Sequence, residues 1–338
     1  MSKRSLFWGQ ASGKLGEAVY YRAGGEQRTR AYVKSVKNPK TLAQMMQRIT
    51  MGNLVSMYSA LKPVLSQSFP MRPAHRSAFN EFVSANKNAQ SYAVFKDDVQ
   101  NRFFWPVNMI IAKGDVVVPT NLKFVPSEEG EDEGMTLPYC NWQVLTTTVS
   151  AKALGIDVTS YIGENPENAK YKSLTPYQVY QALTANGNPY DLPSKFVITI
   201  YTGSLDAGWV AGEGANGLMA GGYSQYVCSA VESECSYRFV GNELTAGEGR
   251  IAIADCEVSN DGKDVNIYSL MVGHGLKYTN MAAGVILSFK QDGKMRVTSS
   301  KVYADAELAD ATESLLPGGD NYELVLKNYG YNPDSILA

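Results

Sequence analysis

Apolar and polar positions alternate along residues 15–35, on both sides of Gly24 and Gly25. Alternation with a period of two is typical of a β-strand, and a Gly-Gly pair allows the positive φ angles of a tight turn. The pattern therefore predicts a β-hairpin. We expect one of its faces to mix cations with aromatic rings, and the members of that face are Tyr20, Arg22, Arg28, Arg30 and Tyr32. The members of the opposite face are Val19, Tyr21, Gln27, Thr29, Ala31 and Val33.

The apolar spacing becomes helical after residue 40. Thr41 is of a type that caps helices, and Pro39 ends the extended segment because the residue before a proline avoids the α region. The apolar positions that follow at helical spacing are Leu42, Met45, Met46 and Ile49. Pro63 is expected to kink or split this helix. A second helix is predicted over residues 73–86, so that the two helices form an αα-hairpin.

Beyond residue 100 the spacing is mostly that of strands. Strands are predicted over residues 196–201, 223–230, 237–240, 251–258 and 265–271. The strongest local signal is a hairpin that joins residues 285–289 to 295–302 through Asp292 and Gly293, since Asp-Gly is a favoured two-residue turn. The body is therefore expected to be built mainly from antiparallel strands.

Two short helices are predicted within this β-rich part. The first begins at Thr175 and Pro176 and runs to residue 183, because threonine caps helices and proline is favoured at the first helical position. The second covers residues 305–315 and ends before Pro317.

These elements predict an α+β protein. A β-hairpin and a helical hairpin come first, and a larger, β-rich antiparallel body follows. The best boundary lies near residue 100, where helix content and the sign of the charge both change. We therefore expect residues 1–100 to form a basic N-terminal arm, hairpin and helical module, and residues 101–338 to form an acidic β-rich body.

Charge is segregated along the chain. Residues 1–100 carry 15 Lys and Arg against 5 Asp and Glu, whereas residues 101–338 carry 16 against 28. The total of −2 therefore hides a basic front and an acidic body. Such a molecule attracts either a polyanion or copies of itself, front to back. The most acidic segment is expected to be a solvated loop that receives the front, and its charged members are Glu128, Glu129, Glu131, Asp132 and Glu133.

Composition narrows the functional classes. The 338 residues include no stretch of about 18 uncharged apolar residues, so no membrane span is expected. The first residues are basic and lack an apolar core, so we do not expect a secretory signal. The four cysteines form no CxxC pair, which favours free thiols in a reducing compartment. A bridge among Cys228, Cys235 and Cys256 remains an open alternative.

The sequence offers little catalytic chemistry. Only two histidines are present, His75 and His274, and neither lies near a Ser or Cys in a recognisable nucleophile motif. Residues 212–217 match G-x-G-x-x-G, but the glycine-rich continuation favours a loop over the helix that a nucleotide site requires. The acidic segment lacks the alternating ligands of a calcium loop. We therefore expect no enzyme activity, no cofactor and no metal.

The first 90 residues or so resemble a known family. The residues that carry the resemblance are Gly13, Leu15, Gly16, Val19, Arg30, Asn38, Pro39, Thr41, Gln44 and Arg48. The segment is similar to the start of an uncharacterised family encoded by gut Bacteroidota and by their crAss-like phages. The resemblance implies a structural or assembly role in a phage particle, with no known enzymatic activity. Gln44 and Arg48 lie one helical turn apart, on a face that can hold the hairpin or a neighbouring subunit.

The leading expectation is a non-enzymatic virion structural protein that is assembled in the bacterial cytoplasm. It would form a ring or collar at the portal–tail region, with itself and other virion proteins as partners. The residues expected at the assembly interface are Arg22, Arg28, Arg30, Pro39, Thr41, Gln44 and Arg48, with the acidic segment 128–133 as their counterpart. The alternatives are a nucleic-acid-binding or DNA-packaging accessory protein, a capsid decoration protein, and a cell-surface or carbohydrate-binding module.

Overall fold

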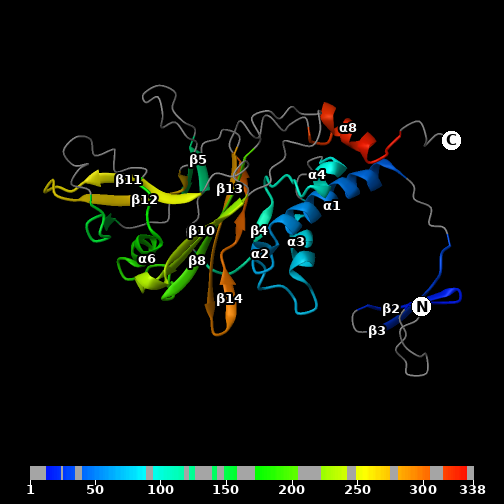
Figure 1. Ribbon diagram of the computed structural model, residues 1–338, viewed down its shortest axis with the longest axis horizontal. Coiled ribbons are helices and arrows are strands. Elements are labelled where there is room, and N and C mark those ends of the chain that lie inside the picture. Colours follow the sequence, from blue (N-terminus) through cyan, green and yellow to red (C-terminus); the bar gives the residue numbers. More distant parts are fainter. Residues whose placement is uncertain are drawn as a thin grey trace.

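The computed structural model describes twelve stretches of the chain. They are residues 13–23, 26–34, 40–88, 94–117, 122–125, 139–142, 148–157, 172–204, 222–241, 249–274, 281–304 and 315–332. Helices and antiparallel sheets are both present, so the predicted α+β class is confirmed. The N-terminal strands, the helices and the β-rich body follow one another in the expected order (Figure 1).

The largest sheet forms the centre of the body. Its strands are β8 (Lys195–Ser204), β9 (Gly222–Ser229), β10 (Ser236–Val240), β13 (Met281–Gln291), β14 (Lys294–Val297) and β16 (Tyr303–Ala304). They follow the order β10-β9-β8-β13-β14, and β16 pairs with β13. The predicted Asp-Gly hairpin is confirmed, because Asp292 and Gly293 have φ angles of 49° and 73° between β13 and β14.

A second sheet packs against the first. It contains β5 (Leu122–Val125), β6 (Tyr139–Trp142), β7 (Val149–Ser150), β11 (Arg250–Val258) and β12 (Val265–His274). One hydrophobic cluster joins the two sheets, with Ile198 and Leu287 from the first and Ile253 and Ile267 from the second. A smaller pair is formed by β4 (Ile110–Ala112) and β15 (Ser300–Lys301). All the strands predicted in the body therefore exist.

Helix α6 (Pro176–Thr184) adds to this core and confirms the first of the two predicted short helices. Thr175 caps it through a capping box, in which the Thr175 hydroxyl accepts from the Gln178 backbone and the Gln178 side chain accepts from the Thr175 backbone. The second predicted helix lies almost entirely outside the described residues, which resume at Leu315.

The helical hairpin is confirmed with shifted boundaries. Helix α1 (Leu42–Ala60) is capped by Thr41, as expected, and Pro63 lies in the short separate helix α2 (Lys62–Leu65). Helix α3 (Ala78–Asn86) begins later than predicted, because the Ser77 hydroxyl accepts from the Asn80 backbone and fixes the first turn there. Of the apolar positions at helical spacing, Met45 and Ile49 are fully buried, whereas Leu42 is 42% exposed.

The helices are packed on the body. One hydrophobic cluster contains Leu54 of α1 and Phe82 of α3 together with Trp105, Tyr201 and Ile286 from beyond residue 100. The change of charge near residue 100 therefore does not coincide with a gap in the core. The hydrophobic clusters of the body contain no residue from 13–34.

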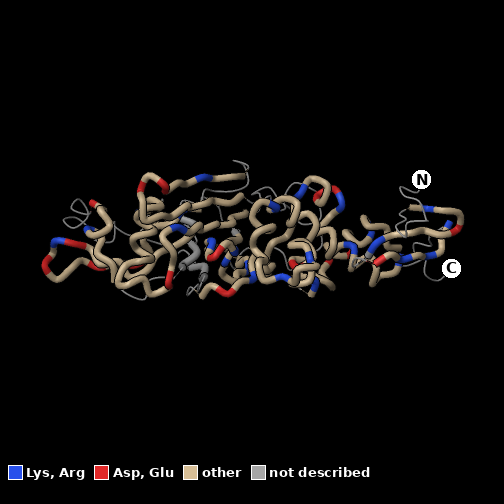
Figure 2. The backbone as a smooth tube through the Cα atoms, turned by 90° about the horizontal axis from the view of Figure 1, so that it is seen from below, with Lys and Arg blue, Asp and Glu red and all other residues tan. Residues whose placement is uncertain are grey.

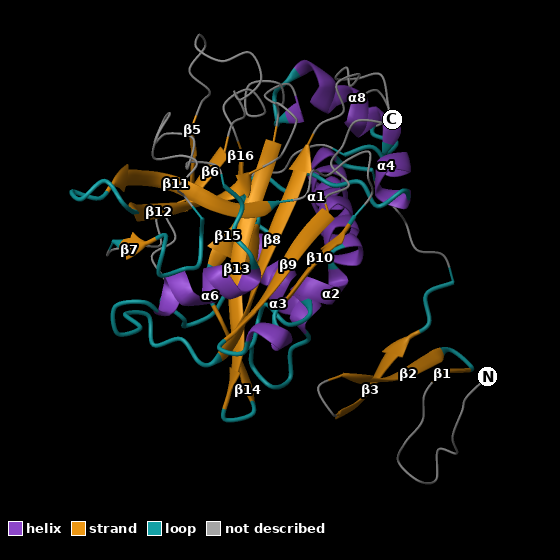
Figure 3. Cartoon of the chain, turned by 60° about the vertical axis from the view of Figure 1, so that its left-hand side comes forward, coloured by secondary structure: helices purple, strands orange, loops and turns teal. Residues whose placement is uncertain are grey.

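The first three strands form a separate sheet, which we call the N-terminal sheet. It consists of β1 (Gly13–Leu15), β2 (Ala18–Ala23) and β3 (Glu26–Ala31), and it confirms the predicted hairpin. Figures 1 and 3 show it standing away from the body, beyond the start of α1. None of the side chains described between residues 13 and 34 is buried. The N-terminal sheet therefore lacks a hydrophobic core of its own.

The expected faces of the hairpin are wrong. Tyr21 pairs with Arg28, and Tyr20 pairs with Thr29. Residues directly opposite one another share a face, and a two-residue loop pairs odd positions with even ones. Arg28 and Arg30 therefore lie with Tyr21, and not with Tyr20 and Arg22.

Helix α8 (Asp320–Asn328) has no counterpart among the predicted helices; it follows Pro317 and packs on the start of α1 (Figure 1). Its first turn is acidic and its last turn contains Lys327, as the helix dipole favours. Its N-cap is Gly319, which makes no side-chain cap. The start of α8 therefore has no capping side chain that a sequence pattern could reveal.

Candidate assembly site

The first face of the N-terminal sheet has more cations than carboxylates, and we call it the basic face. Its charged and aromatic members are Lys14, Glu17, Tyr21, Glu26, Arg28, Arg30 and Tyr32. The Lys14 Nζ lies 3.5 Å from the centroid of the Tyr32 ring, and the Arg30 guanidinium lies 5.9 Å from that of Tyr21. The cations within the strands of the N-terminal sheet are Lys14, Arg28 and Arg30 on this face and Arg22 on the other, and Figure 2 shows blue positions at the N-terminal end.

The opposite face is mostly apolar, and we call it the apolar face. Its apolar members are Leu15, Ala18, Tyr20, Ala31 and Val33, while Arg22, Gln27 and Thr29 lie towards its far end. The Leu15 side chain is 46% exposed and that of Val33 is 60% exposed. No part of the described body covers these side chains, so this face is open to a partner.

The start of α1 contains three of the predicted site residues. The Thr41 hydroxyl accepts from the Gln44 backbone at 3.4 Å, which gives Thr41 a capping role. The side-chain oxygen of Gln44 is buried and has no hydrogen-bond partner. Arg48 is half-buried, and its Nη1 donates to the Met45 sulfur at 3.9 Å. Thr41 therefore stabilises the first turn of α1, and the contact of Arg48 with Met45 lies within the same helix.

Two predicted parts of the site lie outside the described residues. They are Pro39 and the acidic segment with Glu128, Glu129, Glu131, Asp132 and Glu133. The contact between the basic front and this acidic segment therefore stays a prediction.

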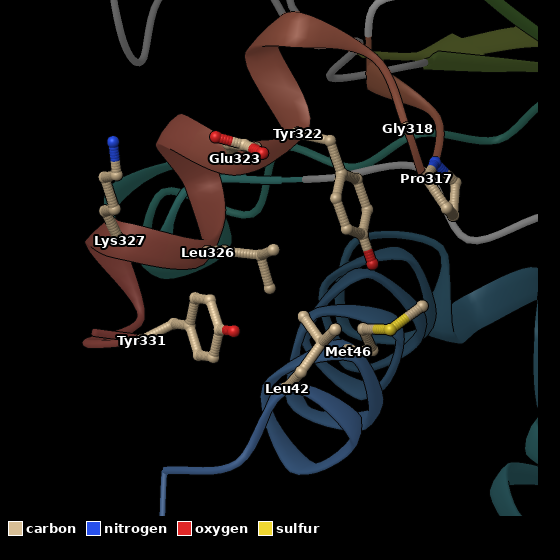
Figure 4. Close-up of a pocket in the computed structure, with 9 residues that line it drawn as sticks. All are labelled: Leu42, Met46, Pro317, Gly318, Tyr322, Glu323, Leu326, Lys327 and Tyr331. Carbon is tan, nitrogen blue, oxygen red and sulfur yellow. The ribbon is translucent and has the colours of Figure 1, made fainter. Parts of the chain in front are cut away.

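A groove lies between α8 and the start of α1, and no sequence pattern indicated it (Figure 4). Its volume is about 350 Å³. The lining residues are Leu42, Met46, Pro317, Gly318, Tyr322, Glu323, Leu326, Lys327 and Tyr331. Tyr322 and Leu326 form its buried floor, whereas Leu42 is exposed at its side. The groove is thus an apolar hollow with charged residues at its rim.

The floor of the groove contains an unpartnered polar group. Figure 4 shows the Tyr322 ring extending from α8 towards Leu42 and Met46 of α1. Its hydroxyl is buried and has no hydrogen-bond partner, and burial raises the pKa of Tyr322. An unpaired buried hydroxyl is costly, so a ligand that accepts this hydrogen bond would be favoured.

A glycine turn closes the end of α8 next to the groove. Gly330 has a φ of +90°, a conformation that other residues rarely adopt. A Cβ at this position would meet the Lys40 Nζ at 2.8 Å, so Lys40 lies directly against the turn. The Tyr331 backbone donates to the Leu326 carbonyl at 2.9 Å, which is the hydrogen bond of a Schellman-type helix end. The turn places Tyr331 at the groove.

Helix α4 (Lys96–Gln100) adds a buried carboxyl group near α1 and α8. Asp98 is 2% exposed, and one of its side-chain oxygens has no partner. Burial raises the pKa of Asp98 to about 6, and this shift is opposed by a hydrogen bond from the Phe95 backbone. Burial raises the pKa of Tyr329 to about 12, and the Asp98 charge adds to that increase.

No cluster of three or more His, Cys, Asp and Glu with metal-binding geometry occurs among the described residues. His75 lies on an exposed turn before α3. Cys228, Cys235 and Cys256 are free thiols, so the alternative of a bridge among them is wrong. Burial also raises the pKa of the Cys228 thiol, which makes it less reactive.

No family model, no curated protein and no solved structure matches this chain. Among the helices that the structure describes, none has both the length and the apolar character that crossing a membrane requires.

Proposed function

We propose that the protein is a non-enzymatic structural component that assembles with copies of itself through its N-terminal sheet. The observation that carries this proposal is the sheet's lack of any buried described side chain, together with its exposed Leu15 and Val33. A small sheet needs a packed face for stability in water. The body does not supply one, so a neighbouring molecule is the natural source.

Electrostatics supports the same proposal. The N-terminal sheet belongs to the basic front, whereas residues 101–338 carry 28 Asp and Glu against 16 Lys and Arg. Opposite charges on two parts of one molecule attract copies front to back. Contacts of this kind either close into rings or continue as filaments. The ring or collar that we propose is the closed form.

The proposed setting is a phage particle. The resemblance to the family of gut Bacteroidota and their crAss-like phages is carried by residues of the N-terminal sheet and of the start of α1. Those are the parts that the assembly proposal uses. We therefore propose a virion structural protein, assembled in the host cytoplasm and placed at the portal–tail region.

Solution mass tests the proposal directly. We expect the full chain to be oligomeric by light scattering, and a variant lacking residues 1–35 to be monomeric. The body of that variant should keep its cooperative thermal transition, because its hydrophobic clusters contain no residue from 13–34. A full chain that stays monomeric at high concentration would contradict self-assembly. Loss of the transition in the variant would show instead that the sheet belongs to the folding core.

A second candidate function is nucleic-acid binding, which the basic face favours. Lys14 and Arg30 lie over the rings of Tyr32 and Tyr21, and cations interleaved with aromatic rings suit a nucleic-acid strand. The two functions differ in how added DNA changes the mass of the protein in solution. Under the assembly proposal, DNA added to the oligomer leaves its mass per protein copy unchanged, whereas a DNA-binding protein gains mass with a strong salt dependence.

A further inference from the structure

We infer that the groove between α1 and α8 is the docking site for the apolar face of the N-terminal sheet from a second copy of this chain. This inference rests on the proposed function and names the surface that receives the sheet. It goes beyond the expected acidic counterpart, because the groove is mainly apolar.

The two surfaces match in their apolar character. Leu15 and Val33 are exposed on the sheet, and Leu42 is exposed beside the buried Leu326 in the groove. Packing these surfaces together removes apolar surface of Leu15, Val33 and Leu42 from water, and burial of apolar surface is the main favourable term in protein association. A groove of about 350 Å³ has room for side chains of this kind.

The groove also offers a hydrogen bond that the sheet can accept. The Tyr322 hydroxyl is buried without a partner on the groove floor. Strand β3 lies at an edge of the N-terminal sheet, so one side of its backbone has no neighbouring strand. Carbonyl groups on such an edge are available acceptors. Docking of this edge would satisfy the Tyr322 donor.

Charge complementarity favours the same partner. Arg22 lies on the apolar face towards its far end, and Glu323 lies at the rim of the groove. Neither of them makes an ion pair within the described part of the chain. A docked sheet brings Arg22 close to the exposed Glu323 carboxylate. An ion pair of this kind fixes the orientation of the docked sheet more than it adds to the affinity.

The position of the groove suits an exchange between copies. Leu42 lines the groove and is also the first residue of α1, so the chain that leads to the N-terminal sheet leaves the body beside the groove. A sheet that leaves one molecule at this point is placed to reach the groove of the next molecule in a head-to-tail arrangement. When the contact passes from copy to copy in one direction, it builds the proposed ring.

A charge placed in the groove tests the inference. Leu42→Glu puts a carboxylate into the apolar contact, and we expect it to weaken self-association by about 100-fold. The fold should tolerate this change, because Leu42 is 42% exposed and an acid in the first helical turn is favourable. The matched control is Leu324→Glu. Leu324 is 45% exposed on α8 but does not line the groove, so this control should associate like the natural protein.

A mixing experiment tests the partnership in trans. A full chain with Leu15→Glu and Val33→Glu has a defective sheet and an intact groove, whereas Leu42→Glu has an intact sheet and a defective groove. We expect each variant alone to be monomeric by light scattering. An equimolar mixture should form a one-to-one complex, because one intact contact remains possible.

The outcomes separate this inference from the proposed function. If the full chain is monomeric, the proposed function fails and the inference fails with it. If deletion of residues 1–35 gives a monomer while Leu42→Glu remains fully oligomeric, the proposed function stands and the groove is not the docking site. The groove then has another occupant, such as a different protein. Two monomeric variants that do not complement each other would likewise overturn docking between copies.

Discussion

Asp98 shows how packing changes the chemistry of a single residue. Its carboxyl group is 2% exposed, and burial raises its pKa to about 6. An unfolded aspartate titrates near 3.9, so the folded protein binds this proton more tightly than the unfolded chain does. The contribution of Asp98 to the free energy of unfolding is therefore highest below pH ~4 and is lost as the pH rises towards and through 6, where Asp98 becomes charged.

Asp98→Asn should remove this dependence. We expect the variant to be more stable than the natural protein at pH 7, by about 1–3 kcal/mol, and equally stable near pH 4. Urea unfolding at several pH values measures the difference. The control is Asp97→Asn, because Asp97 is exposed on the same helix and should leave the pH profile nearly unchanged. A variant that is less stable at every pH would mean that the Asp98 carboxylate makes a stabilising contact.

Tyr322 is a residue at which an effect on stability can be measured separately from an effect on docking. Its buried hydroxyl has no partner, so Tyr322→Phe should leave the free energy of unfolding unchanged or raise it by about 1 kcal/mol. The same substitution should weaken self-association several-fold, because the docked sheet loses one hydrogen bond. Chemical denaturation and concentration-dependent light scattering measure the two effects.

The matched control is Tyr201→Phe. Tyr201 also has a buried hydroxyl without a partner, but it lies in the core formed with Phe104 and Ile286, away from the groove. Its removal should affect stability alone. If both variants associate like the natural protein, the Tyr322 hydroxyl takes no part in docking.

At the scale of the elements, local signals in the sequence are sufficient to predict where several helices begin and where a hairpin turns. Thr41 and Thr175 predict the starts of α1 and α6, and Asp292 with Gly293 predicts the β13–β14 turn. Each of these signals acts through a hydrogen bond or a φ angle within a few residues of itself. The physical cause is local, so the sequence alone reveals it.

The remaining elements depend on register or on distant packing. The predicted faces of the hairpin were wrong because Arg28 pairs with Tyr21. Across a two-residue loop, odd-numbered positions of one strand lie opposite even-numbered positions of the other. Helix α8 lacks a side-chain cap and gains its stability by packing Tyr322 and Val325 against Met45 and its neighbours in α1. The groove exists only because these helices, from opposite ends of the sequence, lie together. No local pattern contains that information.

At the scale of the whole molecule, the position at which the charge changes sign differs from the position at which the hydrophobic core begins. The sign of the charge changes near residue 100, yet the core joins Leu54 and Phe82 to Trp105 across that point. No residue from 13–34 belongs to the hydrophobic clusters. The described helices of the basic front are thus packed on the body, whereas the N-terminal sheet is not (Figure 1).

The basic face of the sheet should therefore act on association through its charge. The double substitution Arg28→Glu with Arg30→Glu reverses the sign of the charge on the basic face and leaves the apolar face unchanged. We expect it to weaken self-association about tenfold at low salt. The difference from the natural protein should shrink as salt rises, because exposed charges are screened.

The control is Lys62→Glu with Lys113→Glu, which changes the net charge equally at exposed positions on the body. An unchanged association constant in the arginine variant would show these side chains to be merely solvated, whereas equal weakening in both variants would assign the effect to net charge. Weakening confined to Arg28 and Arg30 would mean that the basic face meets an acidic surface of a neighbouring copy while the apolar face occupies the groove.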